Sequence, residues 1–262
     1  LNAKLILFKK LMKEGSVAIF DEDTKYAEIL KNICKKNKIK KFTIGELNGD
    51  LLIEKYSIVD NKQELTFSFN KKKYNLKTKL IGKIQIKNLL MSILAAHKSN
   101  IKLDNILKSV ENIKAVPGRF EEIGNFKNNS IAILDYAHTP DALKTCVLNI
   151  KEQFKHRKVN LVFGCGGDRD KPKRSIMGKI ANDLCDKIYL TDDNPRTESP
   201  KKIRKNIKAK ILKSKLVEIP SRKKAIEKAI KDLRSDEILI VAGKGHENYQ
   251  EYKTKKFFSD KA

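Results

Sequence analysis

The sequence lacks several features that assign many proteins to a class at first sight. Its four cysteines form no Cys-x-x-Cys pair, which favours free thiols in a reducing compartment. The histidines and cysteines show no spacing typical of a metal site. No apolar run is long enough to span a bilayer, and no signal peptide is recognisable. We therefore expect a cytoplasmic protein with no membrane partner.

Acidic residues are scarce relative to basic ones, with 32 Asp and Glu against 57 Lys and Arg, and the net charge is +25. A nucleic-acid-binding protein is the first class that such a charge suggests. The lysines are nevertheless spread along the whole chain and do not cluster in one arm or helix. This distribution favours a lysine-rich surface around a site for anionic small molecules, with no nucleic-acid partner. A basic nucleic-acid-binding domain is the alternative.

The first part of the chain predicts an α/β structure that is followed by antiparallel strands. Apolar residues at helical spacing alternate with short strand-like runs up to residue 44, which is typical of α/β folds. Between residues 51 and 80, apolar and polar residues alternate around an Asp60–Gln63 turn, as they do in antiparallel strands. The expected elements are helices at 1–13, 24–36, 84–97 and 103–113, and strands at 17–20, 41–44 and within 51–80.

A second α/β part is expected after the segment Lys114–Glu121, where Pro117 and Gly118 interrupt regular structure. Strand, loop and helix then recur, which predicts a parallel, doubly wound sheet. Thr139 has the residue type of a helix N-cap, and Pro140 suits the first helical position. The expected strands are 131–134, 159–163, 187–190, 216–219 and 237–242, and the expected helices are one from 139 and those at 173–184, 200–212 and 221–233.

Polar loops follow four of these strands, near Asp135, Arg169, Asp193 and Glu247. The carboxyl ends of parallel strands lie on one edge of a sheet, and open α/β sheets bind ligands at that edge. We therefore expect the four loops to converge on one site.

The loop Thr191–Glu198 is the richest of the four in recognition groups. Asp193 offers a carboxylate, Asn194 an amide, and Arg196 a planar fork that fits a carboxylate. Pro195 restricts the backbone between Asn194 and Arg196, so the positions of these two side chains relative to each other are fixed. A ligand with a carboxylate for Arg196 and an ammonium group near the acids is an amino acid. Taken alone, the stretch fits equally well an Asx-type turn that caps the next helix.

Two glycine-rich turns, Gly164–Asp170 and Gly243–Glu247, also follow strand ends, and glycine lets a ligand approach the backbone closely. Neither is a G-x-G-x-x-G fingerprint or a phosphate-binding loop, so each alone predicts no more than a tight turn. His138, three residues after Asp135, alone predicts only a residue at a helix entry. These stretches indicate a function only in combination.

The combination resembles the Mur ligase family. In that family an N-terminal UDP-substrate domain precedes a central ATPase domain and a Rossmann-like C-terminal domain. The resemblance implies that residues 1–115 are the back half of the central domain and residues 116–262 the C-terminal domain, which binds the incoming amino acid. The phosphate loop and the modified lysine that helps to hold magnesium would lie before Leu1, so the chain is expected to be a fragment. The motifs that carry the resemblance are 116–121, 134–143, 162–171, 191–200 and 242–250.

The resemblance is to those Mur ligases that add meso-diaminopimelate to UDP-N-acetylmuramoyl-L-alanyl-D-glutamate (the UDP-MurNAc-dipeptide) during peptidoglycan synthesis. It implies an ATP-dependent reaction through an acyl phosphate, with Mg²⁺ held mainly by residues outside this chain, in a cytoplasmic enzyme expected to act as a monomer on small molecules. A related ligase that adds lysine or acts on folate, and a non-catalytic ligand-binding module, are the alternatives.

Site residues follow from the resemblance, position by position. Asn88, Arg119 and Asp135 match nucleotide contacts, and His138 and Arg169 match residues close to the reacting groups. Two matches are partial. Phe20–Asp23 stands where the family has Asn-x-Asp-Asp at a strand end. Residues 84–88 stand where the family has Phe-Asn-x-x-Asn at the start of a helix, and they keep only its second asparagine. The diaminopimelate site would consist of Arg169, Asp193, Asn194, Pro195, Arg196, Gly243 and Glu247.

Because no phosphate-binding loop lies between Leu1 and Ala262, we expect this chain on its own neither to hydrolyse ATP nor to form an amide bond. Phosphate release from the purified chain, with ATP and meso-diaminopimelate present, is the measurement. A diaminopimelate-dependent rate above that of a protein-free control would contradict the expectation.

Overall fold

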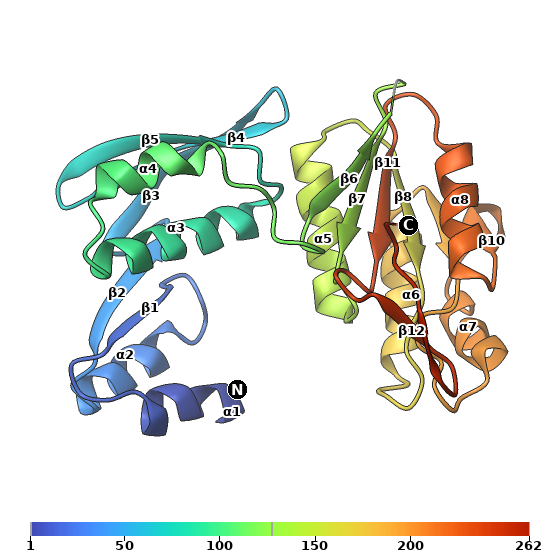
Figure 1. The fold of residues 1–262 in the computed structure, drawn as a ribbon, viewed down its shortest axis with the longest axis horizontal. Helices are drawn as coiled ribbons and strands as arrows, with labels where there is room; N and C mark the ends of the chain where they lie inside the picture. The colour runs from blue at the N-terminus through green and yellow to red at the C-terminus, as the bar shows by residue number, and fades with distance from the viewer. Residues whose placement is uncertain (1, 127, 262) are drawn as a thin grey trace. The chain divides into compact units, whose positions relative to one another are not determined.

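A computed structural model describes residues 2–126 and 128–261, and it divides between Lys114 and Ala115 into two compact units (Figure 1). The division lies at the start of the segment in which the sequence places a linker. Each unit has its own sheet and its own buried core. None of the described helices is both long and apolar enough to cross a membrane.

The first unit is built on a five-stranded sheet of order β1-β2-β3-β4-β5. β1, β2 and β3 pair in parallel, whereas β3, β4 and β5 pair antiparallel, so the expected hairpin continues the α/β sheet. The strands are β1 Val17–Asp21, β2 Lys40–Gly45, β3 Leu51–Val59, β4 Lys62–Phe69 and β5 Lys72–Thr78. The helical segments are α1 Asn2–Ile6, the π-helical η1 Leu7–Leu11, α2 Ala27–Lys36, α3 Lys83–Lys98 and α4 Leu103–Val110.

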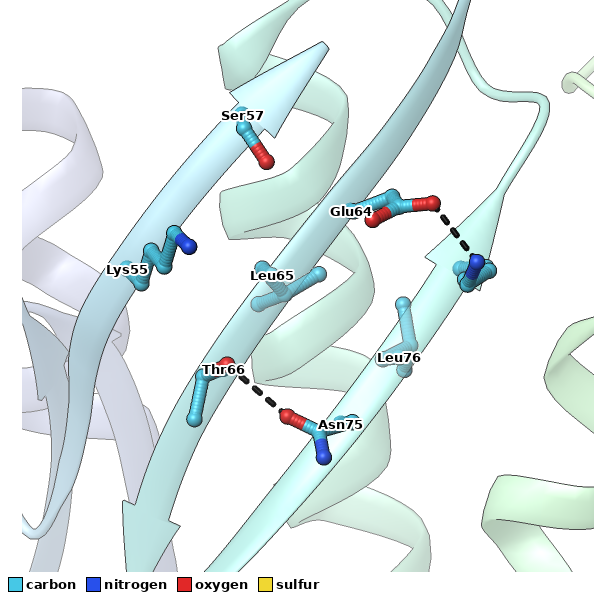
Figure 2. A pocket seen from close by; sticks show the side chains of 8 residues that line it. Lys55, Ser57, Glu64, Leu65, Thr66, Asn75 and Leu76 are labelled. Carbon is cyan, nitrogen blue, oxygen red and sulfur yellow. Dashed lines mark hydrogen bonds and ion pairs between the residues drawn. The ribbon is translucent and has the colours of Figure 1, made fainter. Parts of the chain in front are cut away.

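The antiparallel strands show why the sequence alternates there. Leu65, Phe67 and Phe69 of β4 are buried on one face. The polar residues between them lie on the other face, where Glu64 pairs with Lys77 and Thr66 bonds to Asn75 across the strands (Figure 2). Both hairpin turns have two residues with positive φ, Asp60-Asn61 and Asn70-Lys71, as tight two-residue hairpin turns require.

The second unit contains a six-stranded sheet of order β10-β9-β8-β11-β7-β6, in which only β6 runs antiparallel to its neighbour. α5 packs on α6 and α6 on α7, whereas α8 packs on β8, β9 and β11. Every residue of β7, β8 and β11 is buried, as expected for a parallel sheet with both faces covered. The strands are β6 Glu121–Asn125, β7 Ile131–Asp135, β8 Val159–Phe163, β9 Lys187–Leu190, β10 Leu216–Glu218 and β11 Ile238–Ala242.

The helices of the second unit begin where the sequence predicts. Thr139 caps α5, since its side-chain oxygen accepts a hydrogen bond from the Ala142 backbone N–H at 3.3 Å, and Pro140 is the first helical residue. The helices are α5 Pro140–Gln153, α6 Lys173–Leu184, α7 Pro200–Lys208 and α8 Arg222–Asp232, with a short 3-10 turn, η2, at Lys213–Lys215. α7 ends four residues before the predicted Leu212, and α4 three before Ile113.

Two features of the second unit are absent from the sequence-based prediction. β6 falls partly in the expected linker, and its pattern is obscured by a bulge between Glu122 and Gly124, where the pairing with β7 shifts register. The antiparallel pair β12 Tyr249–Glu251 and β13 Lys255–Phe257 follows the last glycine-rich turn. Strands of three residues are too short to show a period of two.

We expect the second unit to fold without the first, because its sheet and core are complete within Ala115–Ala262. Limited tryptic digestion of the whole chain should cut first near Lys114, which is exposed. The released fragment should melt in one cooperative transition. Cleavage within 131–242 before the segment 111–118 would contradict this boundary.

Candidate functional site

A pocket of about 540 Å³ opens at the carboxyl ends of β7, β8, β9 and β11, where the four polar loops meet. The predicted convergence is therefore confirmed. Pro195 and Asp135 do not line the pocket, although Pro195 lies in the loop after β9 and Asp135 is the last residue of β7. Seven residues singled out from the sequence line it: His138, Arg169, Asp193, Asn194, Arg196, Gly243 and Glu247.

Glycines let these loops pack backbone to backbone. A side chain at Gly167 would overlap the Pro195 carbonyl oxygen, and one at Gly164 would overlap that of Thr191. Gly118, with a φ of 71°, leaves no room for a side chain against Gly245 in the last loop. The glycines of these turns thus allow the loops to pack closely against one another. They would also let a ligand approach the backbone.

A partly buried ion pair between the first turn of α6 and the loop after β9 also holds the loop after β8. Arg174, which is 1% exposed, donates from both terminal nitrogens to the Glu198 carboxylate, at 3.0 and 2.9 Å. Glu198 also accepts a hydrogen bond from the Asp168 backbone N–H at 2.7 Å. The hydrogen bonds from Arg174 lower the pKa of Glu198 to about 2. This bidentate pair holds the two loops in register.

The β12–β13 hairpin covers the loop after β9. The Gln250 amide donates to the Asp193 carbonyl oxygen at 2.8 Å, and the Tyr252 hydroxyl donates to the Asp192 carboxylate at 3.0 Å. The Arg196 backbone N–H donates to the Glu251 carbonyl oxygen at 3.0 Å. The hairpin therefore fixes the loop that the sequence places at the centre of the site.

Arg196 has a φ of 54°, a conformation that few non-glycine residues adopt, and its guanidinium lines the pocket. Its Nε donates to the Glu251 carboxylate at 3.2 Å, and its Nη1 donates to the Gly167 carbonyl oxygen at 2.8 Å. These two contacts orient the planar group, and Nη2, which makes no hydrogen bond to another residue that the structure describes, can serve an incoming acceptor. Sequence reasoning missed Glu251, because a glutamate in an unrecognised hairpin has no distinguishing pattern.

Asn194 is held by three neighbours. Its Oδ1 accepts hydrogen bonds from the Lys244 ammonium and from the Glu251 backbone N–H, both at 2.9 Å. Its Nδ2 donates to Glu247 Oε2 at 3.1 Å. The Lys244 ammonium also donates to the Tyr249 carbonyl oxygen at 2.7 Å. From the sequence, the Asn194 amide is expected to bind a ligand. In the structure its oxygen and its nitrogen are both hydrogen-bonded within the protein.

Asp193 lies against the last loop and a second buried cation. Its Oδ2 is 3.9 Å from Nη1 of Arg222, and a side chain at Gly243 would crowd the same oxygen at 3.0 Å. Arg222 is itself paired with Asp260, through two hydrogen bonds of 2.6 Å. Asp193 Oδ2 and Arg222 Nη1 have no hydrogen-bond partner among the described residues. Asp193 thus lies near a buried cation whose charge it shares with Asp260.

Arg169 and His138 also line the pocket. No hydrogen bond or ion pair ties the exposed Arg169 side chain to another residue that the structure describes. The Nδ1 atom of His138 lies 2.9 Å from the Tyr136 carbonyl oxygen, which requires a proton on Nδ1. In a neutral imidazole, Nε2 is then the free acceptor. Arg169 can bind an anion, and His138 can take a proton.

The three residues assigned to a nucleotide are not brought together in one unit. Asn88 is exposed on α3 of the first unit, whereas Arg119 and Asp135 belong to the second. The Arg119 guanidinium lies 4.5 Å from the centre of the Tyr136 ring. The Asp135 carboxylate accepts backbone hydrogen bonds from Phe120 and Ala137, both at 2.9 Å, and its burial raises the pKa of the carboxyl. Asp135 thus ties two loops together, and its ribose contact stays a prediction.

Family comparisons match both units. A model described as the Mur ligase middle domain matches residues 1–96, and one described as the Mur ligase glutamate ligase domain matches residues 118–245. Proteins named UDP-N-acetylmuramoyl-L-alanyl-D-glutamate–2,6-diaminopimelate ligase are 42% identical to the chain in Rickettsia montanensis and 38% in Clostridium botulinum. These matches cover 100% and 99% of the chain.

The chain spans only about half the length of these relatives, 54% and 52% respectively. A solved structure of a 2,6-diaminopimelate ligase aligns with a TM-score of 0.65 and 30% identity, over 99% of this chain and 54% of that one. A ligase named MurF from Thermotoga maritima, solved with ADP, aligns with a TM-score of 0.71 at 16% identity, over 94% of this chain and 53% of that one, which shows the fold alone.

The Arg174–Glu198 pair predicts a pH-dependent stability for the second unit. When folding lowers the pKa of a carboxyl group, the ionised group stabilises the folded state at any pH above its pKa in the unfolded chain. This stabilisation is lost as the pH falls toward and through its pKa in the folded protein. The stabilisation from Glu198 should therefore be lost between about pH 4.3, the ordinary glutamate pKa, and about pH 2. Glu198→Gln should lower the free energy of unfolding at pH 6 by about 2 kcal/mol, since Arg174 loses its charged partner but the Glu198 side chain is partly exposed.

Denaturant unfolding of both proteins at pH 6 and pH 3 is the measurement. The difference between wild type and Glu198→Gln should shrink at the lower pH. An equal difference at the two pH values would contradict the ion pair. Lys179→Met, which breaks an exposed pair with Asp183, is the control and should have little effect at either pH.

Proposed function

Since the chain belongs to the Mur ligase family, we propose that it is the middle and C-terminal part of an ATP-dependent ligase that adds meso-diaminopimelate to UDP-N-acetylmuramoyl-L-alanyl-D-glutamate. The observation that carries the proposal is the pocket in the second unit, in which Arg169 and Arg196 line the same cavity as Asp193 and Glu247. Meso-diaminopimelate has an amino-acid group at each end, so one amine can react while the other end is held.

The pocket can hold the far end of such a substrate through charge. Arg196 presents an oriented fork, and Arg169 is exposed with no partner among the described residues. Together they can bind the far carboxylate. Glu247 Oε1, whose nearest donor is the Tyr136 hydroxyl at 3.4 Å, is the oxygen best placed to accept the far ammonium group. We assign Asp193 a smaller share in ammonium binding than the sequence suggests, because Arg222 lies against it.

The reaction needs an activated carboxylate and a neutral amine. In the proposed reaction ATP supplies the phosphoryl group that converts the γ-carboxyl of the D-glutamate into an acyl phosphate, and the amine displaces phosphate. The attacking amine must lose a proton, and His138 Nε2 can accept it at the rim of the pocket. Arg119, exposed against Tyr136, suits the nucleotide. The chain's own contribution is mainly to orient the reactants.

The proposed reaction uses Mg²⁺, but none of the site residues named above is proposed to bind it. The described residues hold no group of three or more His, Cys, Asp or Glu side chains that could bind a metal ion. We therefore assign no residue of this chain to Mg²⁺. A cytoplasmic location and a monomeric state remain predictions from the sequence.

A lysine-adding ligase is the second candidate. Lysine has no far carboxylate, so it would leave the charged donors of Arg196 and Arg169 without an acceptor. A site built around a polar group of the substrate discriminates strongly against an analogue that lacks it, by roughly 10⁴-fold or more. The orientation of Arg196 into the pocket therefore favours meso-diaminopimelate.

Arg196→Ala tests the proposal in the full-length protein. Loss of one partner from a charged, hydrogen-bonded pair costs about 2–5 kcal/mol, so the KM for meso-diaminopimelate should rise by roughly two orders of magnitude. The KM for ATP should stay nearly unchanged. Lysine should gain relative to meso-diaminopimelate. Steady-state ligation with each amino acid, at saturating ATP and UDP-MurNAc-dipeptide, gives these constants.

Arg196→Lys is the matched comparison, because it keeps the charge and loses the planar fork. Its KM for meso-diaminopimelate should lie between those of wild type and Arg196→Ala. If Arg196→Ala impairs the use of ATP as strongly as that of the amino acid, the loop serves the nucleotide or the fold and the assignment is wrong.

A further inference from the structure

Lys244 is a fully buried cation directly behind the pocket, and nothing in the proposed reaction yet uses it. Its side chain is 0% exposed. Its ammonium contacts three oxygens: Asn194 Oδ1, the Tyr249 carbonyl oxygen, and, at 3.4 Å, Glu247 Oε2. A buried ammonium is costly unless it is paired and hydrogen-bonded, and these three acceptors match its three donors.

The ammonium determines which way round the Asn194 amide lies. Lys244 can only donate hydrogen bonds, and so can the backbone N–H of Glu251. Both approach the same atom of Asn194, so that atom must be the oxygen. The amide nitrogen is then forced toward Glu247 Oε2. Lys244 thereby orients two residues that line the pocket, without lining it itself.

The same ammonium offsets the charge of Glu247. Of the three acids that line the pocket, Asp193 lies against Arg222, Glu247 is paired with Lys244, and the exposed Asp170 forms no ion pair with another described residue. Glu251, which does not line the pocket, is paired with Arg196. Two cations of the lining, Arg169 and Lys173, form no ion pair with another residue that the structure describes, although Lys173 donates to the His138 carbonyl oxygen at 2.9 Å. The unpaired charges of the lining are therefore two cations and one acid. A pocket with this balance attracts a carboxylate and gives little net attraction to a ligand end that carries only an ammonium.

We propose that Lys244 is a positioning and specificity-determining residue of the amino-acid pocket. By orienting Asn194 and balancing Glu247, it makes the pocket prefer an amino acid whose far end carries a carboxylate together with an ammonium group over one whose far end is an ammonium alone. This inference rests on the proposed function, because it concerns the choice among amino acids that the ligase adds.

A competition assay in the full-length protein tests the inference. Wild type and Lys244→Met receive ATP, the UDP-MurNAc-dipeptide and an equimolar mixture of meso-diaminopimelate and L-lysine, and the two products are quantified by mass spectrometry. The product ratio depends only on the ratio of the kcat/KM values, so a loss of folded enzyme does not alter it. In Lys244→Met the uncompensated Glu247 should shift the ratio toward the lysine product by about tenfold or more.

Two further variants separate charge from general damage. Lys244→Met combined with Glu247→Gln removes the uncompensated carboxylate, and its product ratio should return toward that of wild type. Lys255→Met is the matched control, since Lys255 also lies over the Tyr249 ring, at 4.7 Å against 5.3 Å for Lys244, but is exposed on β13. Its product ratio should equal that of wild type.

Three results would overturn the inference: an unchanged ratio in Lys244→Met, an equal shift in Lys255→Met, or no product at all from both Lys244→Met and Lys244→Gln. In the last case the ammonium is needed to form the pocket and not to choose the ligand. A wild-type protein that adds neither amino acid would instead overturn the proposed function itself.

Discussion

Three buried cations hold the pocket of the second unit together. Arg174, Arg222 and Lys244 are each no more than 1% exposed, and a charge at that depth must find partners. Arg174 reaches the loop after β9, Arg222 the C-terminal segment, and Lys244 both the loop after β9 and the hairpin. Because each cation bridges segments far apart in sequence, the loops have little freedom to move separately. The binding groups are therefore set in place before a ligand arrives.

This arrangement changes what the acids of the site contribute. From the sequence, Asp193 and Glu247 are acceptors for a ligand's ammonium group. In the structure each has a buried cation nearby, at 3.9 Å and 3.4 Å, which reduces the negative charge that either presents to a ligand. What distinguishes the pocket is its exposed Arg169 and the oriented guanidinium of Arg196. A charge that is paired within the protein attracts a ligand weakly, and an unpaired charge attracts it strongly. The unpaired charges of such a site therefore determine which ligand it selects.

The sequence predicts five strands of the second sheet, their parallel direction and the meeting of four loops, because buried runs and glycine-rich turns leave a local pattern. It predicts neither the order of these strands nor β6. It does not predict the hairpin of Tyr249–Phe257, whose strands are too short to show a period. It also gives no sign that Lys244 is buried, since a lysine in a polar turn is ordinarily solvated. Burial of a charge is a property of the tertiary structure, and only the packed loops reveal it.

The place of β11 in the sheet has a consequence for how the protein is made. This strand is the last of the six to leave the ribosome, yet it lies in the middle, between β7 and β8. Ile131 pairs with Ile238, more than a hundred positions later in the chain. During translation β7 and β8 are therefore complete well before the strand that joins them, and their inner edges stay unpaired for most of that time. Pairing at such sequence separation is slow, and open strand edges of this kind are sites at which chaperones bind or chains aggregate.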